Sequence, residues 1–227
     1  MKEYSNIEKK VIEASLQECK DQTLESTKQF FMVHELRENP VAQINKSYNN
    51  YYNIYLKVKT HQYYWALQFE IINGLPVVKF GSCWNHANIY LSITSTSVHP
   101  DKITKLLKID PSEKRVKGEP PFPNVERLNK VNRWKYNYPL DRVADCLEDK
   151  IERILNDIAP KFDALEHLSD ELSVFIGGAL YELPEYSGGF IITPDQMAKM
   201  SKINAIFNID LYASSIVLPR MPDRYIV

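Results

Sequence analysis

Between residues 88 and 212, segments in which apolar and polar residues alternate are interspersed with segments in which apolar residues recur every three or four positions. The first pattern predicts half-buried strands, and the second predicts amphipathic helices. The predicted order is strand, helix, strand, long helix, strand, strand, helix, strand. This order favours an α+β fold with a mixed or antiparallel sheet and helices packed on one face, and a ferredoxin-like variant is compatible with it.

Local signals place the helices of this region. Pro100 fits the first turn of a helix, where its missing N–H costs nothing. Asp141 is positioned to cap the longest helix, and Pro160 is expected to end or kink it. Residues 193–196 (Thr-Pro-Asp-Gln) combine capping-box spacing with proline at the first helical position, which predicts another helix. The apolar stripe of the longest helix consists of Val143, Leu147, Ile151, Ile154, Leu155 and Ile158.

The strands of the same region are separated by less regular sequence. A proline-containing loop is predicted from Asp110 to Asn132, followed by a strand over residues 133–136. The strand over residues 172–176 is expected to bulge or bend at Gly177 and Gly178, because glycine tolerates irregular backbone. Residues 190–192 predict a further short strand.

The first 86 residues follow a different pattern. Residues 5–37 have apolar residues at helical spacing, which predicts one helix or two in tandem, ended by Asn39-Pro40. Aromatic and β-branched residues dominate residues 48–80, as in strands, and Asn73-Gly74 predicts a hairpin turn there. The predicted division is an N-terminal helical and aromatic-rich β extension (1–86), an α+β domain (87–218) and an irregular tail (219–227).

Charge and hydropathy exclude several classes of function. Lys and Arg number 28 and Asp and Glu 29, so no overall field draws the chain to nucleic acid or to an anionic membrane. The first residues lack the apolar run of a signal peptide, and no stretch approaches the roughly 20 apolar residues of a membrane span. Cys19, Cys83 and Cys146 are odd in number and widely spaced, which suits free thiols in a reducing compartment. We therefore expect a cytoplasmic protein without a membrane partner.

Five segments of the second half together form a recognisable set. They are Pro100–Thr104, Ile109–Ser112, Lys117-Gly118, Trp134 and Asn208–Tyr212. In their order and spacing they resemble the bacterial family known as domain of unknown function 4279. The resemblance spans residues 87–212 and leaves residues 1–86 unmatched. It implies a fold unit, and it carries over no catalytic residue.

Catalytic and metal-binding chemistry has little support in the sequence. Cys83 and His86 have a spacing that can chelate zinc, but a structural zinc site needs about four ligands and no second Cys/His pair accompanies them. Gly118 is followed neither by a lysine-serine pair nor by a clear helix start, unlike a phosphate-binding loop. We predict no catalytic residue, no metal site and no cofactor.

Two groups of residues are candidates for binding. Residues 113–135 hold the densest basic run, which can clamp a phosphate, a nucleic-acid backbone or an acidic protein. The candidates there are Lys114, Arg115, Lys117 and Arg133, with the neighbouring Trp134. The aromatic residues Tyr51, Tyr52 and Tyr55 can stack on bases or form a protein contact surface. Both groups also have a purely structural interpretation, because most charge runs are solvated faces and most strand aromatics belong to a core.

These observations favour a non-enzymatic interaction protein that covers the surface of a partner protein, in the manner of bacterial immunity, anti-defence or inhibitor proteins. The alternative is a binding module for nucleic acid or a phosphorylated ligand, centred on the basic loop 113–135. An enzyme is a third class, and it requires a pocket with convergent polar groups. The oligomeric state does not follow from the sequence.

Overall fold

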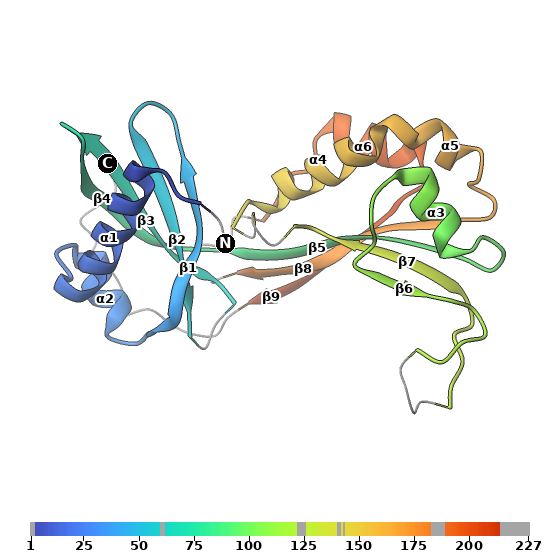
Figure 1. Cartoon of the computed structure of the whole chain (residues 1–227), viewed down its shortest axis with the longest axis horizontal. Helices are drawn as coiled ribbons and strands as arrows, with labels where there is room; N and C mark the ends of the chain where they lie inside the picture. The colour runs from blue at the N-terminus through green and yellow to red at the C-terminus, as the bar shows by residue number, and fades with distance from the viewer. Residues whose placement is uncertain are drawn as a thin grey trace.

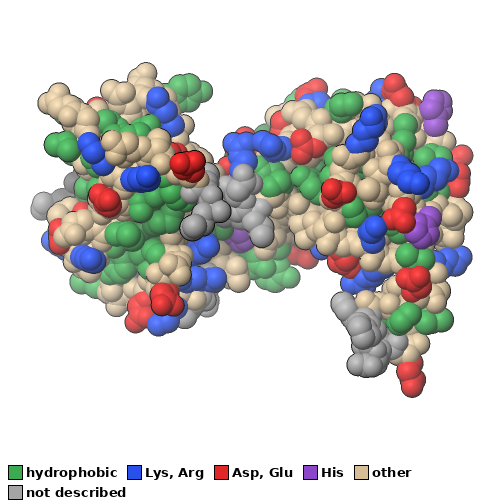
Figure 2. Space-filling model, in the orientation of Figure 1, with side chains coloured by type: hydrophobic (Ala, Val, Ile, Leu, Met, Phe, Trp, Pro, Cys, Tyr) green, Lys and Arg blue, Asp and Glu red, His purple; other side chains and the backbone are tan. Residues whose placement is uncertain are grey.

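The computed structural model describes residues 3–59, 62–121, 126–139, 142, 144–182 and 189–213. Over these residues the chain forms a four-stranded and a five-stranded β-sheet, which follow each other along the long axis of the molecule (Figure 1). Figure 2 shows the two corresponding lobes with a narrower waist between them. The predicted α+β class is confirmed.

The N-terminal unit is an antiparallel meander, in which the strand order β1-β2-β3-β4 follows the chain. Its elements are α1 (Asn6–Asp21), α2 (Glu25–Phe31), β1 (Leu36–Lys46), β2 (Tyr51–Val58), β3 (Tyr64–Ile72) and β4 (Leu75–Trp84). The two helices in tandem are as predicted. The hairpin turn is confirmed as well, because Asn73 and Gly74 have φ angles of 52° and 76°, the left-handed pair that a two-residue type I′ turn requires.

Pro40 does not end a helix, contrary to the prediction. The second helix already ends at Phe31, and Pro40 lies inside β1. This strand is at the edge of its sheet, and its pairing with β2 is irregular between Leu36 and Val41. Proline fits this position because its missing N–H is not needed for a regular ladder.

Helices α1 and α2 pack on one face of the N-terminal sheet. The ring of Phe30 from α2 stacks on that of Trp65 from β3, with centroids 4.3 Å apart. Val11 of α1, Ile54 of β2 and Leu67 of β3 belong to the same buried cluster. The intervening strand residues therefore point to the face turned away from the helices.

The C-terminal unit has the strand order β6-β7-β5-β8-β9. Its elements are β5 (His86–Ser95), α3 (Pro100–Leu107), β6 (Glu113–Arg115), β7 (Asn132–Asn137), α4 (Leu147–Ile158), a 3₁₀ turn (Ala159–Lys161), α5 (Phe162–Glu166), β8 (Ser173–Glu182), α6 (Pro194–Lys202) and β9 (Ile206–Ala213). The segment β5-α3-β6-β7-α4-β8 is a βαββαβ unit with antiparallel strands in the order fourth, first, third, second. This is the ferredoxin-like topology. Strand β9 is added parallel to β8 through α6.

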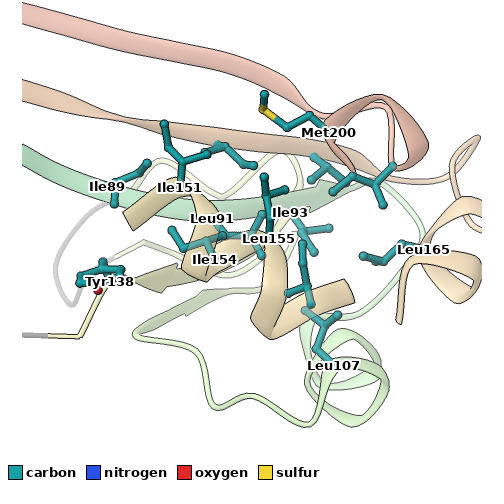
Figure 3. Close-up of a cluster of buried hydrophobic side chains, with 14 of the residues drawn as sticks. Ile89, Leu91, Ile93, Leu107, Tyr138, Ile151, Ile154, Leu155, Leu165 and Met200 are labelled. Atoms are coloured by element: carbon teal, nitrogen blue, oxygen red, sulfur yellow. The ribbon is translucent and has the colours of Figure 1, made fainter. Parts of the chain in front are cut away.

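The helices of this unit lie on one face of its sheet, as predicted (Figure 1). Ile151 and Ile154 of α4 and Leu91 of β5 are fully buried in one cluster, which Leu107 of α3 and Met200 of α6 extend (Figure 3). No helix in the described part of the chain covers the opposite face. The side chains on that face come from the strand residues that alternate with the buried ones.

Three local predictions for this unit are wrong. Residues 190–192 form no strand; Phe190 instead packs edge-on against Phe207, because a short apolar run can cover a core as a loop. The predicted loop 110–132 contains the short strand β6. Of the bulge or bend predicted at Gly177 and Gly178, the bulge is absent, because the β5–β8 pairing runs unbroken past both residues. Glycine is needed there for close approach instead, since a Cβ on Gly178 would lie 2.0 Å from the carbonyl oxygen of Asn88.

The helix predicted to be the longest, α4, begins later than predicted, at Leu147 with Cys146 as N-cap residue. With 12 residues it is shorter than α1, which has 16. The predicted cap Asp141 and the predicted tail over residues 219–227 lie outside the described residues. At the other end Pro160 acts as predicted: α4 ends at Ile158, and a 3₁₀ turn containing the proline follows.

Candidate binding site on the open sheet face

The face of the five-stranded sheet turned away from its helices, called the open face below, presents its side chains in rows across the strands. The first row is Arg115, Arg133, Thr94 and Ser173, and the second is Glu113, Lys135, Ser92, Phe175 and Ile206. The third row is Asn137, Tyr90, Gly177 and Asn208, and the fourth is Asn88, Ala179 and Asp210. The last row is His86, Tyr181 and Tyr212. The cations are therefore concentrated in the first and second rows, on one side of the Tyr90 row.

Two of the predicted basic residues belong to the open face. Arg115 and Arg133 are direct partners across β6 and β7, so their side chains emerge side by side. The guanidinium of Arg133 donates a hydrogen bond from Nε to the Oγ of Ser92 at 3.2 Å, which fixes its position over the sheet. Arg115 forms an ion pair with Glu113 of the same strand.

The other predicted residues of the basic loop lie elsewhere. Lys114 and Trp134 are partners on the helix-covered face. Trp134 is fully buried, and its Nε1 donates to Thr104 of α3, so its ring is not at the surface. Lys114 forms an ion pair with Asp101 at 2.7 Å, also at α3.

The amine of Lys117 donates to the backbone carbonyl of Thr96 at 3.3 Å. Its backbone N–H donates to the side-chain oxygen of Asn132 at 2.8 Å. Lys117 lies near the start of the segment between β6 and β7, called the arm below, which projects beyond the sheet (Figure 1).

The three predicted tyrosines lie on β2 of the N-terminal unit and do not share one surface. Tyr52 points into the core beneath α1 and α2. Tyr51 and Tyr55 point to the other side of the sheet, where Tyr55 is buried against Tyr64 and Ala144. Only Tyr51 is partly exposed, so the structure does not bring these rings together as a stacking platform.

A groove of about 370 Å³ runs along the basic end of the open face. It is lined by Tyr90, Ser92, Thr94, Arg115, Asn129, Lys130, Val131, Arg133 and Phe175. The lining from Asn129 to Val131 belongs to the returning side of the arm, which is held by backbone hydrogen bonds between Gly118 and Asn129 and between Asn129 and Glu119. The groove thus has a sheet floor and an arm as one wall.

The electrostatics of this end of the open face favour an anion. Burial lowers the pKa of the Lys135 ammonium, and the nearby charge of Arg133 lowers it further. Glu113 counteracts this effect and Arg115 adds to it. A cation held near other cations gains stability when an anion approaches, so a phosphate beside Lys135 and Arg133 is favoured.

Tyr90 is the central aromatic residue of the open face. Its ring leans over Gly177, where a side chain would have a Cβ 2.9 Å from the tyrosine hydroxyl. The ammonium of Lys135 lies 4.2 Å from the centroid of the ring, a cation–π contact. Gly177 therefore makes room for a flat aromatic ring with a cation beside it.

A second aromatic group crosses the sheet in the last row. The rings of Tyr181 and Tyr212 are stacked at 5.2 Å, and those of His86 and Tyr181 at 5.9 Å. The open face consequently carries aromatic rings on both sides of its fourth row.

The Cys83 and His86 pair does not form a chelate. Cys83 points into the N-terminal core, whereas His86 lies on the open face of the other sheet. The Nδ1 of His86 is hydrogen-bonded to Tyr64 at 2.9 Å, and its Nε2 to Asn88 at 2.8 Å. The described part of the chain contains no group of three or more His, Cys, Asp or Glu residues that could hold a metal ion.

Sequence reasoning did not select Tyr90 or Phe175 as site residues, and it included Lys135 only as a member of the basic run 113–135. The alternation of β5 already separates Tyr90, Ser92 and Thr94 from the buried residues, and the same alternation separates Arg133 and Lys135 from Trp134. A signal was therefore present in each strand. It became specific only when strand pairing showed that these outward residues are neighbours.

Comparison with known proteins agrees with the resemblance found in the sequence. No curated protein and no solved structure matches the chain. None of the helices in the described ranges combines the length and hydropathy of a transmembrane span. One family model matches residues 85–214, which is more than half of the chain and includes all strands of the open face. The chain therefore belongs to the family described as Domain of unknown function (DUF4279).

Proposed function

We propose that the C-terminal unit binds single-stranded nucleic acid on its open face. The observation that carries this proposal is the convergence of Arg115 and Arg133 on a groove that Tyr90 and Phe175 also line. The ammonium of Lys135 adds a third cation beside the Tyr90 ring. Guanidinium and ammonium groups hold phosphates, and aromatic rings hold unstacked bases. A single strand requires both kinds of group on one surface.

The shape of the surface supports a polymer over a small phosphorylated ligand. The rows of the open face continue from the arginines to the aromatic group at Tyr181 without a covering helix in the described residues. RNA-recognition modules use the uncovered sheet of a βαββαβ fold in the same way, with strand aromatics that stack on bases.

The proposal is tested with fluorescein-labelled single-stranded RNA and DNA of mixed sequence, measured by fluorescence anisotropy at several salt concentrations. Arg133→Gln and Lys135→Gln are each expected to weaken binding about tenfold. Each is also expected to reduce the slope of log K against log salt by roughly 0.7 for every phosphate that the variant no longer neutralises. Lys102→Gln on α3 is the matched control, since Lys102 is exposed on the helix-covered side.

Equal affinities of the Arg133, Lys135 and Lys102 variants contradict the proposal, as does the absence of binding to both single strands at low salt. Inorganic pyrophosphate and duplex DNA serve as comparison ligands. Binding of pyrophosphate with the same affinity as the oligonucleotide indicates a phosphate site and contradicts a nucleic-acid function.

A second candidate is the partner-protein inhibitor expected from the sequence, and one observation favours it. Leu75, Val77 and Phe80 of β4 are 60%, 40% and 57% exposed, on the side of the N-terminal sheet turned away from α1 and α2. A partner with an apolar surface would cover them. In affinity capture, loss of one stoichiometric partner in Phe80→Ser but not in Arg133→Gln supports this function, and retention in both contradicts it.

Both functions are proposed for a protein of the reducing cytoplasm. The three cysteines are free thiols, and burial raises the pKa of Cys19 and of Cys146 to about 12. Such thiols are unreactive at neutral pH.

A further inference from the structure

A second hollow lies beside the groove on the open face. It has a volume of about 410 Å³, and both hollows share Tyr90 as a wall. Asn88, Lys135, Asn137 and Asp210 contribute polar groups to it, and Ala179 forms its floor. The hollow therefore adjoins the place where the proposed function puts a phosphate.

Two side chains of this hollow, Asp210 and Asn88, offer hydrogen-bonding groups for which the described residues provide no partner. The carboxylate of Asp210 makes no hydrogen bond or ion pair with any residue that the structure describes. The side-chain oxygen of Asn88 is bonded to Nε2 of His86 at 2.8 Å, an arrangement that leaves the amide NH₂ group as the donor toward the hollow. A charged acceptor, the carboxylate of Asp210, and a donor, the amide of Asn88, therefore line the same hollow.

The positions of these two groups match the size of one base. Asn88 and Asp210 share a row and are separated by β8, so their Cα atoms are about 10 Å apart. Ala179 stands between them and leaves the space above β8 open. Rows are spaced about 7 Å along the strands, so the row of Lys135 lies about 14 Å from the row of Ala179, with the Tyr90 row between them. The Lys135 side chain reaches toward Ala179, because both residues line the hollow. A nucleotide with its base over Ala179 then has its phosphate on the Lys135 side.

The chemistry of the hollow selects among the bases. A carboxylate can only accept hydrogen bonds, and guanine alone presents two adjacent donors, N1–H and the N2 amine, next to the acceptor O6. Adenine would present the lone pair of N1 to the carboxylate, and uracil has one donor between two carbonyl oxygens. Asp210 with Asn88 is therefore complementary to the Watson–Crick edge of guanine.

A bound metal cation is a poorer occupant. The hollow is also lined by the amines of Lys135 and Lys150, whose positive charges oppose a second cation. The Lys150 amine donates to the carbonyl oxygen of Ala87 at 2.6 Å, and both residues line the hollow. One acid among two lysines suits a neutral base that donates to the acid.

We infer that this hollow binds guanine, and hence that the single strand recognised on the open face contains guanine at one position. Asp210 accepts hydrogen bonds from N1–H and the N2 amine, and Asn88 donates to O6. The inference rests on the proposed function, which supplies the phosphate contacts of the same nucleotide.

The test measures the affinity of the full-length protein for uridine-rich RNA oligonucleotides with guanine, inosine, adenine or cytosine at one central position. Guanine is expected to bind about tenfold more tightly than adenine, and inosine, which lacks the N2 amine, is expected to fall between them. In Asp210→Asn the affinities for the four oligonucleotides are expected to become equal, while the slope of log K against log salt is unchanged. Asp170→Asn, an exposed acid outside the open face, is the matched control and keeps the preference.

Tight binding with equal affinity for all four oligonucleotides overturns the guanine site and leaves the nucleic-acid function standing. A preference for guanine that persists in Asp210→Asn overturns the role of Asp210. Absence of binding to every oligonucleotide overturns the proposed function, and the guanine site with it.

Discussion

Lys150 is a charged side chain within the C-terminal core, only 1% exposed. Its amine donates to the carbonyl oxygen of Ala87 at 2.6 Å and lies 5.6 Å from the ring centroid of Tyr138. The β5–β7 ladder ends beside this residue. The backbone N–H of Tyr138 donates to the carbonyl oxygen of Ile89, and no further residue of β7 is present to donate to the carbonyl oxygen of Ala87. A lysine from α4 satisfies this buried acceptor, which would otherwise cost about 1–3 kcal/mol.

The burial of Lys150 makes stability depend on pH. Burial lowers the pKa of the amine from 10.5 to about 8, an effect that the Asp145 carboxylate opposes. Between these two values the unfolded chain binds more protons than the folded chain, so the free energy of unfolding rises with pH. Lys150→Met lacks this contribution. From about pH 7.5 to about pH 10, the wild type should therefore gain roughly 2 kcal/mol relative to the variant.

Urea unfolding at a series of pH values measures this difference. Lys105→Met, a change at an exposed lysine of α3, is the control and should follow the wild type. Parallel pH curves for the wild type and Lys150→Met would show that the amine does not titrate in this window.

At the scale of elements, β5 organises the C-terminal unit because it pairs with both β7 and β8. Every second residue of β5 is buried against the helices, and the residues between them, which include Tyr90 and Asn88, point to the open face. The close approach of β8 to β5 depends on the absence of a side chain at Gly178. One ladder thus supports both the core and the candidate site.

Gly178→Ala should break this ladder locally. The added Cβ would lie 2.0 Å from the carbonyl oxygen of Asn88, and a backbone atom cannot move aside without loss of strand pairing. We expect a loss of about 3 kcal/mol or more in the free energy of unfolding. Gly118→Ala is the comparison, because its Cβ meets no atom and only its φ of +83° adds strain, at a cost of about 1 kcal/mol. Similar losses in the two variants would contradict the steric argument.

At the scale of the whole molecule, the two units are joined by a clasp made of Gln43, Trp84, Ala144 and Asp145. Gln43 accepts from the backbone N–H of Ala144 at 2.9 Å and donates to the Asp145 carboxylate at 2.8 Å. The indole of Trp84 donates to the carbonyl oxygen of Ala144 at 2.8 Å. Asp145 also accepts from the hydroxyl of Tyr138, so the clasp reaches the core of the C-terminal unit.

Gln43→Met should loosen the attachment of the units. Methionine has a similar volume, but it leaves the N–H of Ala144 and one carboxylate oxygen of Asp145 without their partner, at a cost of about 2–4 kcal/mol. We expect the single unfolding transition of the wild type to separate into two, measured by tryptophan fluorescence together with far-UV circular dichroism. Gln68→Met removes a comparable bond to Asn53 within the N-terminal sheet and should preserve one transition. Two transitions in both variants would remove the special role of the clasp.

Local signals in the sequence were sufficient for much of the secondary structure. The turn at Asn73-Gly74 needs only two residues that tolerate positive φ, and Thr193 with Gln196 forms the predicted capping box within one helical turn. The stripe of α4 from Leu147 to Ile158 is buried as its spacing indicated. These features depend on neighbours within a few positions, which the sequence displays directly.

The tertiary structure decided which outward residues meet. Arg115 joins Arg133 and Lys114 joins Trp134 because of the β6–β7 register, which places alternate residues on opposite faces. Asn88 and Asp210 are distant in the chain but share a row through β8. Register follows from the burial of whole sheet faces against helices, a property of the assembled core that no short segment contains. By itself, then, the sequence determined the elements, the α+β class and the family, whereas the candidate site exists only through strand pairing.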